Sequence, residues 1–102
     1  MAKKIPELHY RSSRICRVLG NPTAYEIMKM LAKKSMNPTQ IACEMKLSIP
    51  TISAVLRSLR QLDLVRYETA GNGKNYFIKE KKIQSVMRHI ENLVSSIEKG
   101  KY

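Results

Sequence analysis

Two Asn-Pro dipeptides, at residues 21–22 and 37–38, divide the first half of this sequence into short helices. Asparagine is a favoured N-cap, and proline fits the first helical turn because its missing N–H has no partner to lose there. After each dipeptide, apolar residues recur at helical spacing. They are Ala24, Ile27, Met28 and Leu31 after the first, and Ile41, Ala42 and Met45 after the second.

Two more helices flank this pair. Apolar spacing predicts one over residues 8–19, ended by Gly20, with three arginines on its solvated side: Arg11, Arg14 and Arg17. Another begins after a tight turn, where Ser48 can cap it and Pro50 falls in its first turn, and it breaks near Asp63. Its predicted buried stripe is Ile52, Val55, Leu56 and Leu59.

The apolar period changes after this helix. Residues 64–69 and 75–78 are rich in β-forming side chains and flank a turn at Gly71-Asn72-Gly73, which predicts a β-hairpin. Residues 81–99 return to helical spacing. The predicted order is therefore ααααββα, a mainly α fold with a small β-hairpin (α+β), in a single domain over residues 1–102.

This order is that of a helix-turn-helix with a wing. An α-helix reads the major groove when its leading face is free of bulky core residues and presents hydrogen-bonding groups. The helix after Ser48 meets this condition, Arg57 being the best candidate for a guanine or phosphate contact. The predicted DNA-binding residues are Thr39, Gln40, Ile49, Pro50, Thr51, Ser53, Ala54, Arg57, Asn72, Lys74 and Asn75. For Thr39 and Gln40, local capping is an equal alternative to a phosphate contact.

The charge balance agrees with a polyanionic partner. Lysine and arginine number 19 against 8 acidic residues, a formal net charge of +11. A solvated basic surface is the alternative explanation, so the helix-turn-helix pattern has to decide. A winged helix that binds protein or RNA, or a nonspecific architectural DNA binder, remains an alternative function.

The segment from Leu47 to Arg60, followed by Leu64-Val65 and a wing ending in Tyr76, resembles the recognition helix and wing of ArsR-type winged-helix repressors. The Asn21-Pro22-Thr23 helix start is also similar. Lys46 and Asp63 stand where the family commonly has glycine, and Ala24 where it often has arginine. Lys46 must therefore adopt a turn geometry that glycine adopts freely.

The resemblance implies a homodimer joined through the terminal helices, repression at a near-palindromic operator, and roughly 34 Å between recognition helices. The apolar stripe of the last helix agrees, since a lone winged helix has nowhere to bury it fully. The predicted dimer interface is Ile83, Val86, Met87, Ile90, Leu93, Val94 and Ile97. The inducer is unknown.

Other classes of function have little support. No nucleophile, base and orienting group stand at recognisable spacing, so no enzyme is expected. Cys16 and Cys43 are predicted to be reduced, small buried or semi-buried side chains, although an oxidation switch remains an alternative. Residues 35–40, where many family members carry metal-binding cysteines, contain none, and His89 has no second histidine to pair with. We therefore expect no metal, no cofactor, no membrane partner and a cytoplasmic location.

Overall fold

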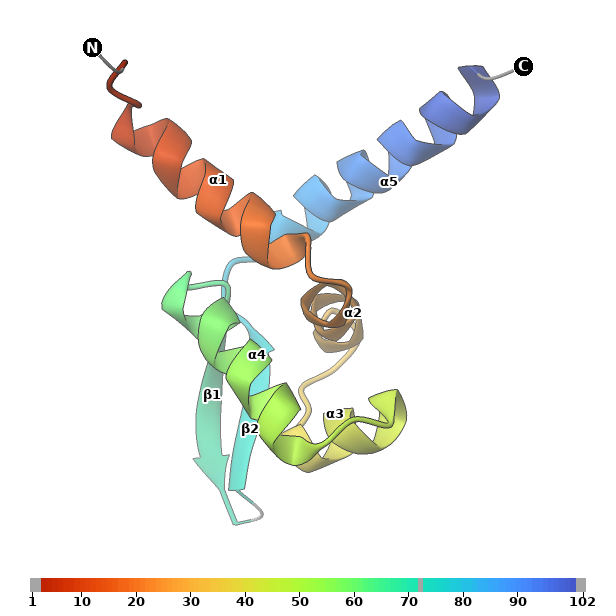
Figure 1. Ribbon diagram of the computed structural model, residues 1–102. Helices are drawn as coiled ribbons and strands as arrows, with labels where there is room; N and C mark the ends of the chain where they lie inside the picture. The colour runs from red at the N-terminus through yellow and green to blue at the C-terminus, as the bar shows by residue number, and fades with distance from the viewer. Residues whose placement is uncertain (1–2, 72, 101–102) are drawn as a thin grey trace.

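The computed structural model describes residues 3–71 and 73–100. Five helices and one antiparallel hairpin follow in the order ααααββα, so the predicted winged helix-turn-helix fold is confirmed (Figure 1). The elements are α1 (Glu7–Leu19), α2 (Pro22–Leu31), α3 (Pro38–Met45), α4 (Ile49–Gln61), β1 (Val65–Ala70), β2 (Gly73–Ile78) and α5 (Lys82–Gly100).

Both Asn-Pro dipeptides cap helices as predicted. The Asn21 side chain accepts hydrogen bonds from the backbone N–H groups of Thr23 (2.8 Å) and Ala24 (3.2 Å). Asn37 forms a capping box: its side-chain oxygen accepts from the Gln40 N–H at 2.8 Å, and the Gln40 side-chain oxygen accepts from the Asn37 N–H at 2.9 Å. These bonds satisfy donors that a helix start leaves free.

One apolar core lies between α2, α3, α4 and the hairpin. Its largest fully buried side chains are Ile27, Met28, Ile41, Ile52, Leu56, Leu59 and Val65. Only Leu19 of α1 is buried, and α5 contributes two buried side chains, Ile83 and Met87. The two terminal helices diverge beyond this point (Figure 1). Most of α1 and α5 therefore stands outside the core.

The hairpin is longer at its tip than the sequence predicts. Strand pairing runs from Val65↔Ile78 to Ala70↔Gly73, so only residues 71 and 72 connect the strands. Gly73 and Lys74 belong to β2 and not to the turn or its flank, which corrects the predicted start of that strand. Gly73 has φ +106°, a conformation that glycine adopts without steric cost.

Two residues carry the left-handed backbone that usually selects glycine. Lys46 (φ 57°) ends α3, and Asp63 (φ 64°) lies between α4 and β1. These are the two positions where ArsR-type proteins commonly have glycine, and the geometry expected of Lys46 is confirmed. The cost is of the order of 1–2 kcal/mol per residue.

None of the helices in the described ranges has both the length and the apolar composition needed to cross a bilayer.

Candidate nucleic-acid interface

The exposed face of α4 is set by what its opposite face buries. Ile52, Leu56 and Leu59 are fully buried. Val55, predicted to be part of this stripe, is only half-buried because it lies at the stripe's edge. On the other side Ala54 and Arg57 are exposed, and Ser53 is half-buried.

A serine cap holds the start of α4. The Ser48 hydroxyl accepts from the Thr51 N–H at 3.3 Å and lies 2.7 Å from the Thr51 hydroxyl. Thr51 is therefore exposed but already engaged in the cap. Ile49 and Pro50 are exposed in the same turn, with Ile49 retaining 47% of its accessible surface. An apolar side chain at this place can meet a thymine methyl group in the major groove.

Arg57 stands free at the middle of the exposed face. No hydrogen bond or ion pair engages its guanidinium within residues 3–71 and 73–100. All five N–H donors are therefore available in the planar fork that matches a guanine edge or a phosphate.

At the start of α3, Gln40 takes part in capping, which is one of its two predicted roles; the other is a phosphate contact. Its side-chain oxygen is used in the capping box with Asn37, as the capping alternative requires. Gln40 is exposed, and its amide NH₂ group carries two further donors that the capping box does not use. Thr39 beside it is exposed. Gln40 therefore combines a capping role with available donors, and Thr39 adds an exposed hydroxyl on the surface that precedes α4.

In the wing, the Lys74 side chain makes a cation–π contact with the Tyr67 ring. The Lys74 ammonium lies 4.6 Å from the centre of the Tyr67 ring, and the Arg60 guanidinium carbon lies 5.3 Å from the same centre. Tyr67 also packs against Tyr76, with ring centres 5.3 Å apart. Asn75 is half-buried opposite Glu68 in the register. Asn72, also a predicted DNA-binding residue, lies outside the described residues.

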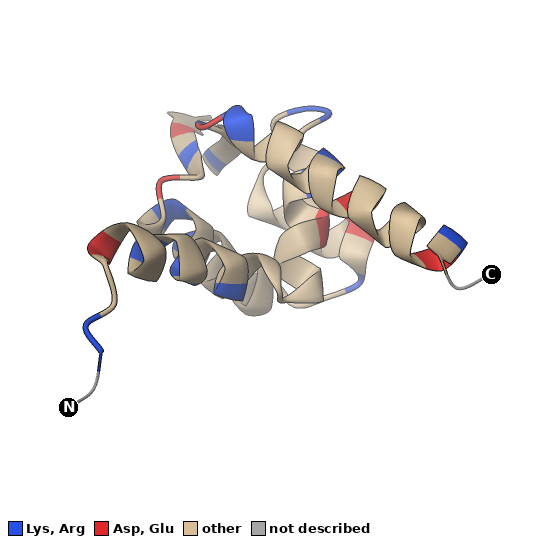
Figure 2. Ribbon diagram, turned by 90° about the horizontal axis from the view of Figure 1, so that it is seen from above, with Lys and Arg blue, Asp and Glu red and all other residues tan. Residues whose placement is uncertain are grey.

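Few acidic side chains neutralise the basic surface. Within the described part of the chain the ion pairs are Lys29–Glu91 and Lys79–Asp63, each with N···O 3.0 Å. The Lys79 hydrogen bond lowers the pKa of Asp63, and the exposed pair keeps that carboxylate ionised. Figure 2 shows the lysine and arginine positions distributed along the ribbon, with far fewer acidic positions among them.

Sequence reasoning missed one polar cluster that joins α2 to α5. The Tyr25 hydroxyl donates to the Glu91 carboxylate, and Lys29 donates to both oxygens of the same group at 3.0 and 3.1 Å. Burial first, and then the Glu91 carboxylate, raise the pKa of Tyr25 to about 12. Tyr25 and Lys29 at i and i+4 were the only local signal, because Glu91 is more than sixty residues away.

The predicted dimer stripe divides into two parts. Ile83 and Met87 are buried in the chain's own core, which removes them from any surface and corrects that part of the prediction. The other five are 40–58% exposed: Val86, Ile90, Leu93, Val94 and Ile97. Three apolar side chains near the N-terminus are exposed too: Ile5, Leu8 and Tyr10.

The cysteines differ from the prediction. Cys16 and Cys43 are both exposed free thiols and not buried or semi-buried, because α1 stands mostly outside the core and Cys43 lies on the outer side of α3. Within the described residues, no three histidine, cysteine or acidic side chains lie together as a metal site would need. His89 is exposed on α5.

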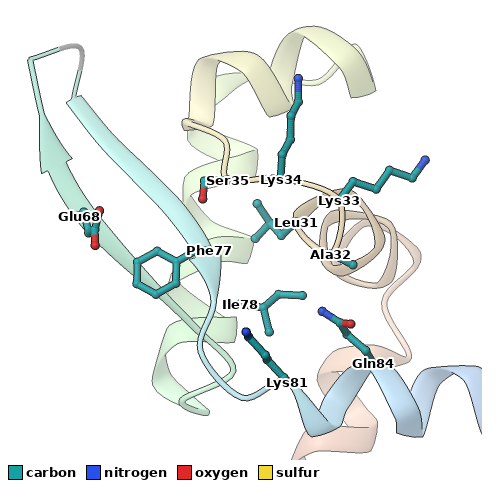
Figure 3. Close-up of a pocket in the computed structure, with 10 residues that line it drawn as sticks. All are labelled: Leu31, Ala32, Lys33, Lys34, Ser35, Glu68, Phe77, Ile78, Lys81 and Gln84. Atoms are coloured by element: carbon teal, nitrogen blue, oxygen red, sulfur yellow. The ribbon is translucent and has the colours of Figure 1, made fainter.

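A further hollow lies away from the exposed face of α4. It has a volume of about 380 Å³ and lies between the end of α2 and the hairpin, with α3 and α4 behind it (Figure 3). Its lining includes Leu31, Phe77 and Ile78 and three lysines, Lys33, Lys34 and Lys81. In Figure 3 the Lys33 and Lys34 side chains extend outward. None of the predicted DNA-binding residues lines it.

Comparison with known proteins identifies this arrangement. Residues 21–67, from the cap of α2 to the middle of β1, match the family described as bacterial regulatory protein, arsR family. The resemblance to ArsR-type winged helix-turn-helix regulators is thereby confirmed over this segment. An uncharacterized HTH-type transcriptional regulator of Methanocaldococcus jannaschii is 28% identical to this chain over 88 residues, 85% of this chain and 99% of that relative.

Solved structures share the winged helix-turn-helix fold. A homodimeric winged helix-turn-helix DNA-binding domain from Mycobacterium bovis aligns with a TM-score of 0.79 at 21% identity, covering 93% of this chain and 91% of that one. A Mycobacterium tuberculosis protein aligns with a TM-score of 0.85 at 16% identity, covering 96% and 98%. The comparisons therefore indicate a DNA-binding transcriptional regulator, since the matched family and the curated relative are transcriptional regulators.

Proposed function

We propose that residues 1–102 act as one sequence-specific unit that binds double-stranded DNA as a homodimer and represses transcription. The observation that carries the proposal is the exposed face of α4. It combines a small side chain, Ala54, with an unengaged guanidinium, Arg57, directly opposite a fully buried stripe. This is the surface that a helix needs in order to enter the major groove and distinguish base pairs.

The proposed contacts extend to both sides of α4. Ile49, Pro50, Thr51 and Ser53 form its leading turns, Thr39 and Gln40 precede them on α3, and Lys74 and Asn75 follow on the wing. Phosphate contacts from the flanking elements would hold the register of α4, and base contacts from α4 would specify the sequence.

The terminal helices support the homodimer. The exposed apolar part of α5 continues past the core, and α1 with the segment before it presents further exposed apolar side chains. Apolar faces of this extent are rare on monomers and mark interfaces. The structural relative from Mycobacterium bovis is itself described as homodimeric. A dimer bound over a promoter would exclude polymerase, which supports repression over activation.

Selection of bound sequences from random duplex DNA, at defined salt, tests the proposal. A near-palindromic consensus with half-sites about one helical turn apart, roughly 34 Å, is the expected result. Enrichment of no sequence, with similar affinity for all duplexes, would make the protein a nonspecific DNA binder. Absence of duplex binding at low salt would leave an RNA or protein partner as the function.

A further inference from the structure

Three arginines of α1 border the end of the recognition helix. Arg11, Arg14 and Arg17 follow each other at intervals of three residues and are all exposed. Such spacing places side chains along one side of a helix. Figure 2 shows basic positions repeated along α1. No ion pair within the described part of the chain involves any of the three.

These arginines line a furrow shared with α4. One hollow of about 180 Å³ is bordered by Arg11 and Arg14 together with Gln61 and Asp63. The next, also about 180 Å³, is bordered by Arg14 and Arg17 together with Ser58 and Gln61. Arg14 and Gln61 therefore occur in both hollows, which lie end to end between α1 and the C-terminal turn of α4.

The furrow continues the DNA-reading face of α4. Pro50, Ala54, Arg57 and Gln61 are spaced by four, three and four residues, so they share one side of that helix. Gln61 lies about 6 Å along the axis from Arg57, at 1.5 Å per residue. A duplex that follows the exposed face of α4 toward its C-terminus therefore reaches Gln61 and then the α1 arginines.

The one acidic side chain at the furrow does not neutralise it. Asp63 borders the first hollow, but its carboxylate is paired with Lys79 at 3.0 Å. Two uncharged polar side chains remain: Gln61, whose amide can donate hydrogen bonds, and Ser58, whose hydroxyl donates to the Ala54 carbonyl at 3.4 Å. The furrow is thus a strip of guanidinium groups with additional donors, and a row of phosphates is the partner whose charge and spacing complement it.

We infer that this furrow, defined by Arg11, Arg14, Arg17, Ser58 and Gln61, binds the DNA backbone at the centre of the operator. The position follows from the elements that form it: α1 belongs to the proposed dimer surface, so the C-terminal end of α4 points toward the partner copy. Each protomer then contacts phosphates between the two half-sites, outside the major groove that α4 enters. The inference rests on the proposed function.

The test uses a charge-matched pair of triple variants. Replacing Arg11, Arg14 and Arg17 with alanine should make the plot of log affinity against log salt shallower by about 0.9 for each phosphate that is no longer neutralised, hence by about 1.8 or more for a symmetric dimer. The base preference should stay unchanged. Replacing Lys33, Lys34 and Lys81, which border the cavity behind the hairpin, removes the same charge and should change the slope little.

DNA with uncharged phosphate analogues shows which phosphates the furrow contacts. Wild-type protein should bind more weakly to an operator that carries uncharged methylphosphonates in place of its central phosphates. On this operator the wild type and the arginine variant should have the same affinity. Sedimentation and circular dichroism establish that the variant is a folded dimer. Should it not be, the single variants Arg14→Ala and Arg14→Lys provide the comparison, and only the first should lose affinity.

The outcomes separate the two proposals. Wild-type protein that binds no duplex overturns the proposed function. Wild-type protein that binds its operator while the arginine variant binds equally well overturns this inference alone. Equal losses of affinity in the two triple variants would show a net-charge effect and no built site. A difference that persists on the methylphosphonate operator would exclude the operator centre.

Discussion

The ammonium of Lys74 lies 4.6 Å from the centre of the Tyr67 ring, across the two strands of the wing. Arg60, from the last turn of α4, lies over the same ring. Each exposed cation–π contact is worth about 0.5–1 kcal/mol. One aromatic ring therefore couples the wing to the recognition helix, and the charge of Lys74 is held over the middle of the wing instead of extending freely from its tip.

This placement predicts a phosphate-binding role for Lys74. Lys74→Ala should weaken binding to operator and scrambled duplexes about equally, and it should make the salt slope shallower by about 0.9 for each phosphate that is no longer neutralised. Lys74→Arg keeps both the charge and the ring contact, and it should bind like wild type. Titrations at several salt concentrations measure both quantities. A loss of affinity confined to the operator would instead indicate a base contact.

Arg57 should behave differently because its free fork faces outward from α4. Arg57→Ala should cost about 1–3 kcal/mol per half-site and relax the preference at one base position. Arg60→Ala, one turn later on the same helix, serves as the control and should leave base preference unchanged, since Arg60 lies against Tyr67. If Arg57→Ala weakens both duplexes equally, Arg57 contacts phosphate.

The exposed apolar part of α5 should control assembly. Ile90→Glu combined with Leu93→Glu should give a monomer with sharply weaker operator binding, because two charges would have to be buried without partners. Asn92→Glu combined with Ser95→Glu adds the same charge to the opposite side of the helix and should leave the dimer intact. Sedimentation velocity measures the oligomeric state. An unchanged dimer in the first variant would place the interface elsewhere.

The left-handed backbone at Lys46 predicts a stabilising substitution. Lys46→Gly should raise the free energy of unfolding by up to about 1 kcal/mol, since relief of a strain of roughly 1–2 kcal/mol exceeds the entropic cost of glycine. Lys46→Ala retains the Cβ and should change stability little. Urea unfolding compares the three proteins. A less stable glycine variant would show that the Lys46 side chain contributes contacts of its own.

The burial of Tyr25 and its hydrogen bond to Glu91 together predict a loss of stability at high pH. The pKa of Tyr25 is raised from 10.0 to about 12, so its contribution is complete below pH 10 and is lost as pH rises toward 12. The same bond lowers the pKa of Glu91 below 4.5, so that contribution is present above this value and is lost as pH falls below it.

The measurement is the free energy of unfolding against pH for wild type and Tyr25→Phe. The substitution removes the hydroxyl while keeping the ring. It should abolish the part of the alkaline decline that belongs to Tyr25 and reduce the acid one. Identical profiles at both ends would mean that the bond does not persist in solution.

Local chemistry accounts for what could be predicted without coordinates. Asn21 and Asn37 cap their helices through atoms two or three residues away, so sequence neighbours suffice to locate α2 and α3. The change of apolar period after α4 located the wing in the same way. Burial of the α4 stripe then determined which side of that helix faces solvent, and hence that Arg57 is free.

Contacts between distant segments decided the rest. Periodicity marks an apolar side of α5, but only the position of the core shows that Ile83 and Met87 are covered while Ile90 is not. Likewise, nothing local relates Tyr25 to Glu91, or Arg14 to Gln61. Helix starts and strand periods depend on bonds and side chains a few residues apart, whereas burial and charge environment depend on which segments the fold brings together.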